Sequence, residues 1–569
     1  MALISSSDFP RMKIDVIKAN KECSDRGLIH SAKWAAELSH ALKNVNINVK
    51  EVVSSLGEEE EKFYQDFDDY VLAKSYFELK EYERAADFTG KCISQKAKFL
   101  HLYSLYLAGE KQKNDDISDT MTPGEVCTNL QLRRLRSEMQ QEHSKLALDG
   151  FGLYLYGVVL KKLDLISDAV VILTEAIHSE PLHWGSWLEL ATLVIDKDML
   201  TSLLLPDSWM KQFFLAHTYL ELQLNEDALV IYNALTDAGL SESTYIMAQI
   251  AIAYHNMRDV DQAVNIFRKL QKVDPFRLDN MDTYSNLLYV KELRVELSFL
   301  AHRACDIDKY RVETCCVVGN YYSLRSQHEK AVLYFQRALK LNPHYLAAWT
   351  LMGHEYMEMK NTAAAIQSYR QAIEVNRRDY RAWYGLGQTY EILKMNYYCS
   401  YYYRQAQQLR PNDSRMLVAL GESYEKLDRL KEAKKCFWKA HSVGDIEGLA
   451  LIKLAKLYAK LGEDHQAASA YSNYIHEVDE TGIQNVDRDE LCHAYKYLAN
   501  HCLKQKDLDG AYTNAQKCTE YNETREEGKS IIRQIAQLRT QTDIDMNDSR
   551  YRTKNDSLHA EPMNLTFTQ

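Results

Sequence analysis

The sequence predicts an all-α superhelical solenoid of 34-residue helix-turn-helix repeats. Stepping through the chain by 34 from Met247 meets a large or apolar residue at each of seven positions, and a small residue follows each one four places later. The composition agrees, because 569 residues with only 8 prolines and 21 glycines contain few turn signals. A repeat array also explains the length, which exceeds what one hydrophobic core fills.

The first half of each repeat is predicted to be a helix with a small residue where the next helix approaches. The small residues are Ala251, Ser285, Gly319, Gly353, Gly387, Gly421 and Ala455. Three positions later stand Tyr254, Leu288, Tyr322, Tyr356, Tyr390, Tyr424 and Tyr458. A spacing of three or four residues places side chains on one helix face, so each first helix should present one packed face.

The second half of each repeat is predicted to be another helix, which packs against the first. Alanines alternate with rings at a spacing of four, as in Ala365 and Tyr369, or Ala433 and Phe437. Pro411 is one of the prolines that close alternate repeats, since proline ends a helix. This order of small residue, tyrosine, alanine, ring, alanine and proline resembles the tetratricopeptide pattern over residues 244–478.

Five segments are expected along the chain. They are an N-terminal helical segment (1–61), N-terminal repeats with an inserted loop at 110–130 (62–240), a regular array with a peptide groove (241–478), C-terminal helices with a divergent repeat (479–537) and a disordered tail (538–569). The loop contains Thr122 before Pro123, a minimal proline-directed phosphorylation site that has to be weighed against an ordinary turn.

Composition and spacing disfavour several classes of function. A net charge of -11 and a sequence pI near 5.9 disfavour nucleic acid as a partner. The apolar runs are too short for a membrane span, and the cysteines show no metal-ligand spacing or secretory leader, so we expect an intracellular chain without a metal or other cofactor. His354 and Glu355 have no second histidine at the spacing a zinc protease needs, and the GxG at Gly385 and Gly387 has no preceding strand. We therefore expect no catalysis.

A peptide groove is expected on the first helices, at positions two, five, nine and twelve of each repeat in the geometry of the resembled repeat family. Position nine forms a polar column of Asn286, Asn320, His354, Gln388 and Glu422. Acidic residues beside it, among them Glu355 and Glu391, favour a basic peptide, and Tyr384 could offer a ring face. The alternative is a merely solvated surface.

Longer segments resemble one family beyond the repeat pattern. The stretches WTLMGHEYMEMKNTAAAIQSYRQAIEVN and RDYRAWYGLGQTYEILKMNYYCSYYYRQAQQLRPNDSRMLVALGE look like the anaphase-promoting complex subunit 8 family. The resemblance implies a non-catalytic scaffold subunit of a multisubunit cullin-RING type ubiquitin ligase, in nucleus and cytoplasm. It also implies contacts with other subunits, a homodimer formed by the N-terminal repeats, and a groove that receives an arginine-containing motif of an activator protein.

Two other classes of repeat protein are alternatives. A co-chaperone would need a lysine and arginine clamp for a carboxylate, but Asp282 stands where its first lysine is expected. A glycosyltransferase with repeats would need a catalytic domain, for which the repeats leave no residues. Both alternatives are weaker than the scaffold interpretation.

Overall fold

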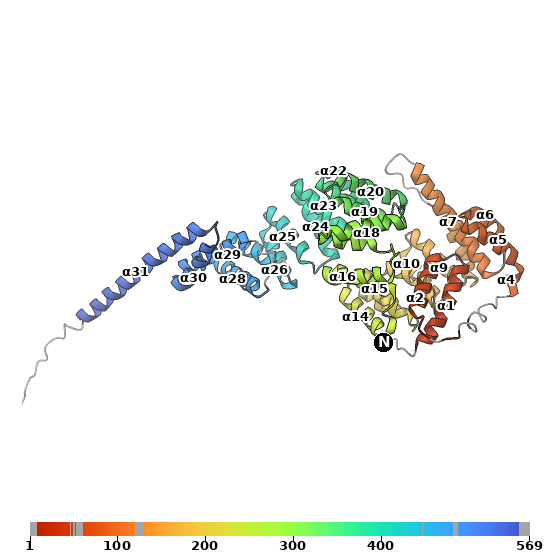
Figure 1. Ribbon diagram of the computed structural model, residues 1–569, viewed down its shortest axis with the longest axis horizontal. Coiled ribbons are helices and arrows are strands. Elements are labelled where there is room, and N and C mark those ends of the chain that lie inside the picture. Colours follow the sequence, from red (N-terminus) through yellow and green to blue (C-terminus); the bar gives the residue numbers. More distant parts are fainter. Residues whose placement is uncertain are drawn as a thin grey trace, which may run out of the picture. The chain divides into compact units, whose positions relative to one another are not determined.

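The computed structural model describes residues 8–45, 47–48, 52, 61–119, 129–445, 448–481 and 488–556. Every regular element among them is a helix, which confirms the predicted all-α class (Figure 1). The chain contacts divide into two units, Met1–Leu324 (unit 1) and Arg325–Gln569 (unit 2). The division lies inside the array whose 34-residue register continues without a break, so periodicity alone gives no sign of it.

Unit 1 begins with a helical hairpin and continues into repeats of paired helices. Its helices are α1 (Phe9–Asp25), α2 (Ile29–Ala41), α4 (Glu61–Gln65), α5 (Phe67–Glu78), α6 (Tyr82–Thr89), α7 (Gln95–Asp119), α8 (Gln131–Ser144), α9 (Gly150–Lys162), α10 (Ile166–Ser179), α11 (Trp184–Leu193), α12 (Lys197–Ser202), α13 (Met210–Glu221), α14 (Asn225–Leu235), η2 (Thr236–Leu240), α15 (Thr244–Met257), α16 (Val260–Val273), α17 (Met281–Val290), α18 (Arg294–Ile307) and α19 (Val312–Leu324).

Unit 2 continues the paired helices and ends in a long helix. Its helices are α20 (His328–Leu341), α21 (Leu346–Glu358), α22 (Thr362–Val375), α23 (Tyr380–Ile392), α24 (Asn396–Leu409), α25 (Ser414–Lys426), α26 (Leu430–Val443), α27 (Leu449–Leu461), α28 (Asp464–Thr481), α29 (Arg488–Lys504), α30 (Leu508–Glu520) and α31 (Arg525–Asp556). We call α21, α23, α25 and α27 the first helices of its repeats.

The predicted close approach of the two helices of a repeat is confirmed. A Cβ atom added to Gly353 would lie 2.5 Å from a ring carbon of Tyr369, and one added to Gly387 would lie 2.4 Å from Tyr403. Such separations are shorter than any van der Waals contact, so only glycine fits there while the ring keeps its place. The rings of Tyr369 and Tyr403 are fully buried, which explains why small residues and rings recur together.

The turn inside each repeat also repeats every 34 residues. A left-handed residue ends each first helix, at Arg258, Glu292, Ser326, Lys360, Lys394, Asp428 and Gly462. The amide of the residue after it then bonds to a carbonyl five residues back, as Met395 N does to Tyr390 O at 2.9 Å. This is the Schellman arrangement, which satisfies carbonyls at the helix end. Six of these seven turns use a residue other than glycine, which costs backbone free energy.

The N-terminal hairpin α1–α2 packs along the repeats of unit 1 (Figure 1). The indole of Trp34 stacks on Trp184, the first residue of α11, with ring centroids 4.6 Å apart. The rings of Phe213 (α13) and Tyr245 (α15) meet Trp34 edge-on. The hairpin therefore covers the N-terminal ends of successive first helices, whereas the sequence predicted only that residues 1–61 are helical.

Charged side chains fasten this hairpin to the repeats near the turn between α1 and α2. Arg26 lies 3.2 Å from the carboxylate of Asp149, the N-cap of α9, and its guanidinium lies 4.0 Å from the ring centre of Phe151. Lys33 on α2 pairs with Asp279 just before α17. Arg26 is buried, so its charge is stabilised by carboxylates rather than by water.

Two helices extend beyond their predicted limits. Helix α7 continues to Asp119, so the start of the loop predicted at 110–130 is helical, because exposed polar residues such as Asn114 are compatible with a solvent-facing helix. Residues 120–128, with Thr122, lie outside the described residues. Helix α31 continues to Asp556, so residues 538–556 of the predicted disordered tail 538–569 are helical.

Candidate functional site

The candidate site is the face of the first helices that points away from the second helices. In unit 2 the ring of Tyr369 comes from the second helix α22 and lies between Gly353 on α21 and Gly385 on α23. Its hydroxyl reaches His354 on the opposite side. His354 and the equivalent residues of α23, α25 and α27 therefore lie on the far face, which we call the inner face of unit 2.

The unit 1 members of the polar column bond to one another. Asn320 is buried with 3% of its surface exposed, and its Nδ2 donates to Asn286 Oδ1 at 2.6 Å and to Ser285 Oγ at 2.7 Å. Asn286 is half-buried. The packing of α17 against α19 therefore joins the two predicted groove residues Asn286 and Asn320 in one amide pair, and their role in binding a peptide stays a prediction.

His354 is an exposed member of the column in unit 2. Its Nδ1 lies 2.9 Å from the hydroxyl oxygen of Tyr369, and the two rings meet nearly perpendicular with centroids 5.5 Å apart. The surrounding protein and the charge of Arg381 lower the pKa of the imidazole to about 4, although part of the ring meets solvent. His354 is therefore neutral at physiological pH.

Glu355 does not line the inner face as a free carboxylate. Only 5% of its surface is exposed, and its Oε2 lies 2.8 Å from His328 Nδ1 on α20. Glu355 directly follows His354 along α21, and the rotation of about 100° from one helical residue to the next turns its side chain into the layer between helices. Glu355 is thus paired inside the helix layer, and its role in holding a basic ligand stays a prediction.

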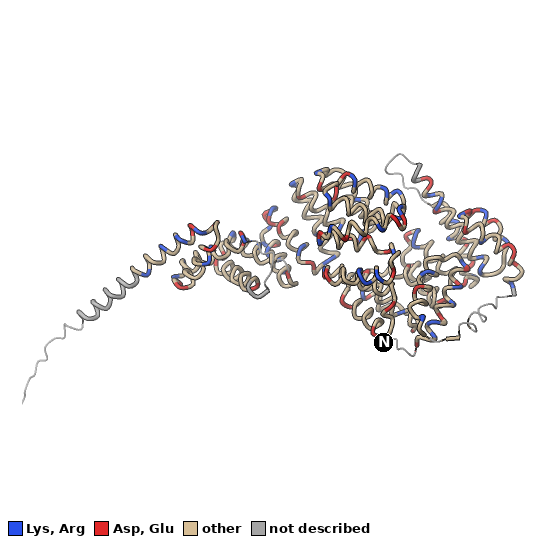
Figure 2. The backbone as a smooth tube through the Cα atoms, viewed as in Figure 1, with Lys and Arg blue, Asp and Glu red and all other residues tan. Residues whose placement is uncertain are grey.

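The remaining predicted acids, Glu391 and Glu422, form ion pairs with lysines of the next repeat. Glu391 accepts from Lys426 Nζ at 2.5 Å and from Tyr403 Oη at 2.6 Å, and Glu422 lies 2.7 Å from Lys453 Nζ. Burial alone would raise the pKa of Glu391, but the bonds from Lys426 and Tyr403 outweigh burial and lower it. The acidic groove predicted from the sequence is therefore a row of ion pairs, and Figure 2 shows acidic and basic residues interspersed along both units.

Aromatic and cationic side chains complete the inner face. Tyr384 is half-buried, with its ring centroid 5.3 Å from that of Tyr403. Gln388 is half-buried on α23 at the position equivalent to His354. At the N-terminal end of α23 the guanidinium of Arg410 lies 4.5 Å from the ring centre of Tyr380. Arg410 was not found from the sequence, because only the positions of the polar column were compared between repeats.

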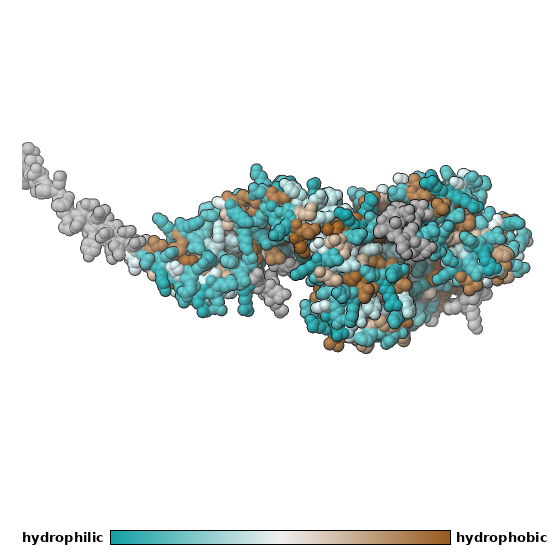
Figure 3. Space-filling model, turned by 90° about the horizontal axis from the view of Figure 1, so that it is seen from above, coloured by the Kyte–Doolittle hydropathy of each residue, from teal (hydrophilic) through white to brown (hydrophobic). Residues whose placement is uncertain are grey.

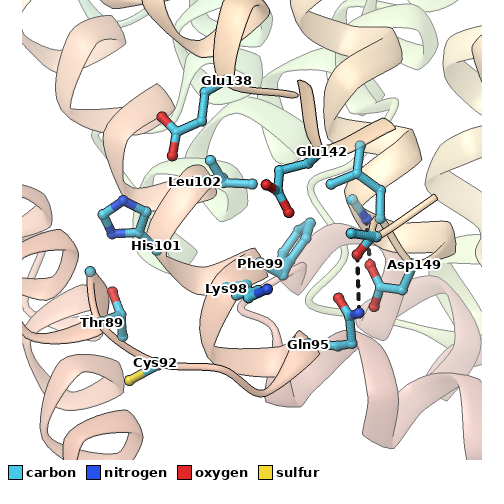
Figure 4. A pocket seen from close by; sticks show the side chains of 14 residues that line it. Thr89, Cys92, Gln95, Lys98, Phe99, His101, Leu102, Glu138, Glu142 and Asp149 are labelled. Carbon is cyan, nitrogen blue, oxygen red and sulfur yellow. Dashed lines mark hydrogen bonds between the residues drawn. The ribbon is translucent and has the colours of Figure 1, made fainter. Parts of the chain in front are cut away.

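Unit 1 contains a separate polar hollow of about 190 Å³ (Figure 4). Glu138 and Glu142 of α8 lie across it from Lys98 and His101 of α7 (Figure 4). His101 Nδ1 donates to the carbonyl of Ala86 at 2.8 Å, since a carbonyl can only accept. The described residues hold no group of three or more histidines, cysteines or acids placed to bind a metal ion.

No helix among the described residues has both the length and the apolar character needed to cross a membrane. In Figure 3 the apolar side chains on the visible face form separate brown patches among polar residues. Phe67 and Val71 of α5 are among the exposed apolar side chains. Such patches are candidates for contacts with other proteins.

Comparison with known proteins identifies the relatives of this chain. A family model described as anaphase promoting complex subunit 8 / Cdc23 matches residues 11–251, and tetratricopeptide-repeat models match residues 245–277, 312–345, 353–393, 414–440 and 449–480. The chain is 59% identical to the cell division cycle protein 23 homolog of Mus musculus over 304 residues, which are 53% of this chain and 50% of the relative. It is 43% identical to anaphase-promoting complex subunit 8 of Arabidopsis thaliana over 357 residues, covering 57% of this chain and 61% of the relative.

The chain spans about half the length of the curated relatives it matches first. Among solved structures, the crystal structure of the APC/C hetero-tetramer Cut9-Hcn1 is similar with a TM-score of 0.53 at 15% identity, covering 91% of this chain and 95% of that chain. At this identity the likeness supports the fold alone, and it agrees with the repeat solenoid.

Proposed function

Because the chain is a tetratricopeptide-repeat protein related to the anaphase-promoting complex subunit 8 / Cdc23 family, we propose that it is a non-catalytic scaffold subunit of that complex. In this role it helps to assemble a multisubunit cullin-RING type ubiquitin ligase and promotes ubiquitination of mitotic regulators. Paired helices that expose long faces suit a scaffold, because each repeat adds surface without needing its own core. The working compartments of such a subunit are nucleus and cytoplasm.

The inner face of unit 2 is the proposed site for an arginine-containing motif of the activator protein. The observation that carries this proposal is the pairing of Glu391 and Glu422 with lysines at a half-exposed surface. Exposed ion pairs contribute only about 0–1 kcal/mol each, so an incoming cation can replace a lysine at little cost. An arginine fork binds a carboxylate through two parallel hydrogen bonds, which one lysine cannot do.

The test uses the full-length protein and a labelled activator peptide that contains the arginine motif. Changing Glu391→Gln and Glu422→Gln together should weaken binding about tenfold or more, since hydrogen bonds to charged groups contribute roughly 1.5–3 kcal/mol each. Fluorescence anisotropy measures the affinity, and the wild-type affinity should fall as salt rises.

Two controls make this test specific. Glu463→Gln removes an acid that pairs with Lys434 on α26, outside the inner face, and should leave binding unchanged. A peptide with citrulline in place of arginine has the same shape without the charge and should bind as weakly as the double variant does. Equal binding of both peptides would exclude an arginine site on this face.

Homodimer formation by residues 62–240 is part of the proposal. Tyr64 of α4 and Phe67 and Val71 of α5 are 60%, 46% and 43% exposed, and the spacing of four places Phe67 and Val71 on one side of α5. A two-fold interface brings the same patch of both copies together, so one apolar stripe can bury its equivalent in the partner.

The dimer is tested by light scattering of the eluting protein during size-exclusion chromatography. Phe67→Glu with Val71→Glu should halve the mass, because two charges would face two others across the axis. Val230→Glu with Val295→Glu changes two other exposed valines of unit 1 and should leave the mass at the wild-type value. A wild-type protein that elutes as a monomer at micromolar concentration would contradict the dimer.

A further inference from the structure

The hydroxyl of Tyr369 has a single hydrogen-bond partner in the described part of the chain. Tyr369 has no exposed surface, and its ring is held between Gly353 and Gly385, where added Cβ atoms would each lie 2.5 Å from ring carbons. The hydroxyl oxygen lies 2.9 Å from His354 Nδ1. No second side chain among the described residues bonds to this hydroxyl, so His354 Nδ1 is the one protein acceptor for its proton.

The direction of this hydrogen bond follows from burial. If His354 Nδ1 carried a hydrogen and donated it, the phenolic hydrogen of Tyr369 would be left buried without an acceptor. Buried donors without partners are rare because each costs the full loss of its hydration. Tyr369 therefore donates and His354 Nδ1 accepts, which places the hydrogen of the neutral ring on Nε2.

The Nε2 side of His354 is open. No hydrogen bond of Nε2 occurs among the described residues, and His354 is exposed on the inner face of unit 2. We propose that Tyr369 is a positioning residue which holds His354 in the Nε2–H form, so that the inner face presents a fixed hydrogen-bond donor to a main-chain carbonyl oxygen of a bound extended segment. This inference rests on the proposed peptide-binding function and adds the kind of ligand atom that the site recognises.

Gln388 extends this recognition to the next repeat. It occupies on α23 the position that His354 occupies on α21, and its amide is likewise without a partner in the part of the chain described. Neighbouring packed helices lie about 8–10 Å apart, and an extended chain advances about 3.3 Å per residue. A segment crossing both helices would thus meet His354 with one carbonyl and Gln388 with a peptide group roughly three residues away.

The charges around His354 keep this donor neutral. Arg381 on α23 disfavours a second positive charge, and the pKa of the ring is lowered to about 4 by its surroundings and by this arginine. On its own helix, Glu355 is engaged by His328 of α20, and Glu358 is exposed. From α22, Tyr369 contributes an uncharged hydroxyl, because burial raises its pKa far above neutrality.

The form of the His354 ring can be measured without any ligand by acylation with diethyl pyrocarbonate. The reagent is attacked by the imidazole nitrogen that has a free lone pair, and in His354 that nitrogen is Nδ1, which Tyr369 blocks. His302 is an exposed control of opposite form, because its Nδ1 donates to the carbonyl of Ser298 at 2.7 Å and leaves the Nε2 lone pair free. We expect His354 to react at least about tenfold more slowly than His302, the factor that one ordinary hydrogen bond gives.

Tyr369→Phe is the informative variant, since it removes the hydroxyl and keeps the ring. His354 should then exchange between both forms and react about as fast as His302, as read by peptide mass spectrometry of the full-length protein. His328, paired with Glu355, reports local unfolding and should keep its wild-type rate. A fast His354 in the wild type, or an unchanged rate in Tyr369→Phe, would overturn the assignment.

Peptide binding separates this inference from the proposed function. His354→Gln keeps an N–H donor and should bind the activator peptide within about threefold of wild type, whereas His354→Ala should weaken it about tenfold. If the wild type binds no peptide while His354 still resists acylation, the proposed function fails and the fixed form of the ring stands. Equal binding by His354→Ala and wild type would overturn the carbonyl contact.

Discussion

The two units use the same repeat but treat the ends of their first helices differently. In unit 1 the hairpin α1–α2 covers these ends with Trp34, which touches rings of α11, α13 and α15. In unit 2 the end of α23 is bordered by Arg410 over Tyr380. The difference shows that the repeat pattern does not determine the environment of these helix ends. Residues at a few positions decide whether an end becomes part of a core or of a polar surface.

The largest expected effect comes from removing the aromatic centre of the covered end. Trp34→Ala should destabilise unit 1 by roughly 3–5 kcal/mol, because the vacated space lies among three rings and cannot close fully. Chemical unfolding followed by intrinsic fluorescence measures the loss. Trp438→Ala makes the same change at a side chain that is 60% exposed and should cost less than about 1 kcal/mol. Equal losses would mean that the hairpin contributes little to unit 1.

A smaller loss of stability is expected from enlarging the glycine at which the two helices of a unit 2 repeat approach each other. Gly387→Ala would place a methyl group 2.4 Å from the Tyr403 ring and should destabilise the protein by about 1–3 kcal/mol through overpacking. Gly90→Ala is the matched change, because its added Cβ would have no neighbour closer than 3.5 Å, and it should stay within about 0.5 kcal/mol of wild type. Thermal unfolding distinguishes the two, and a neutral Gly387→Ala would show that the ring can move.

The pH dependence of unit 2 tests the ion-pair row. The pKa of Glu391 is lowered in the folded protein, so its contribution is present above the usual pKa of a glutamate and is lost as pH falls through the lowered value. Glu391→Gln should therefore reduce the melting temperature at neutral pH but flatten its fall in acid, at pH values below about 4.5. If the melting temperatures of variant and wild type fall in parallel as the pH is lowered through that range, the ion pair of Glu391 is contradicted.

The smallest expected effect concerns the turns inside the repeats. Lys394 and Asp428 adopt left-handed backbone angles, with φ of 57° and 60°. Glycine adopts this conformation without steric cost, so Lys394→Gly should be neutral or stabilise the protein by up to about 1 kcal/mol. Lys291→Gly, one residue before the left-handed Glu292 and itself in the right-handed region, should destabilise instead. The melting temperatures of the two variants give the comparison.

Much of the fold could be predicted because each repeat is a local pattern. The recurring pair of a small residue and a ring, here Gly387 and Tyr403, predicts that the two helices of a repeat pack closely, and the structure places these residues in contact. The candidate site was less predictable. Asn320 and Glu355 are polar residues of the repeat pattern, but their side chains are buried. Glu391 forms an ion pair with Lys426 of the following repeat.

By itself, the sequence determined the helical class, the 34-residue register and the residues that pack within each repeat, because these depend on the spacing along one helix and the next. Only the tertiary structure decided what covers the helix ends of unit 1 and which side chains bond to one another at the inner face of unit 2. Lys33 and Asp279 are 246 residues apart in the chain, and Tyr369 meets His354 by passing between two helices. Contacts of this kind depend on where whole helices lie in space, which periodicity does not encode.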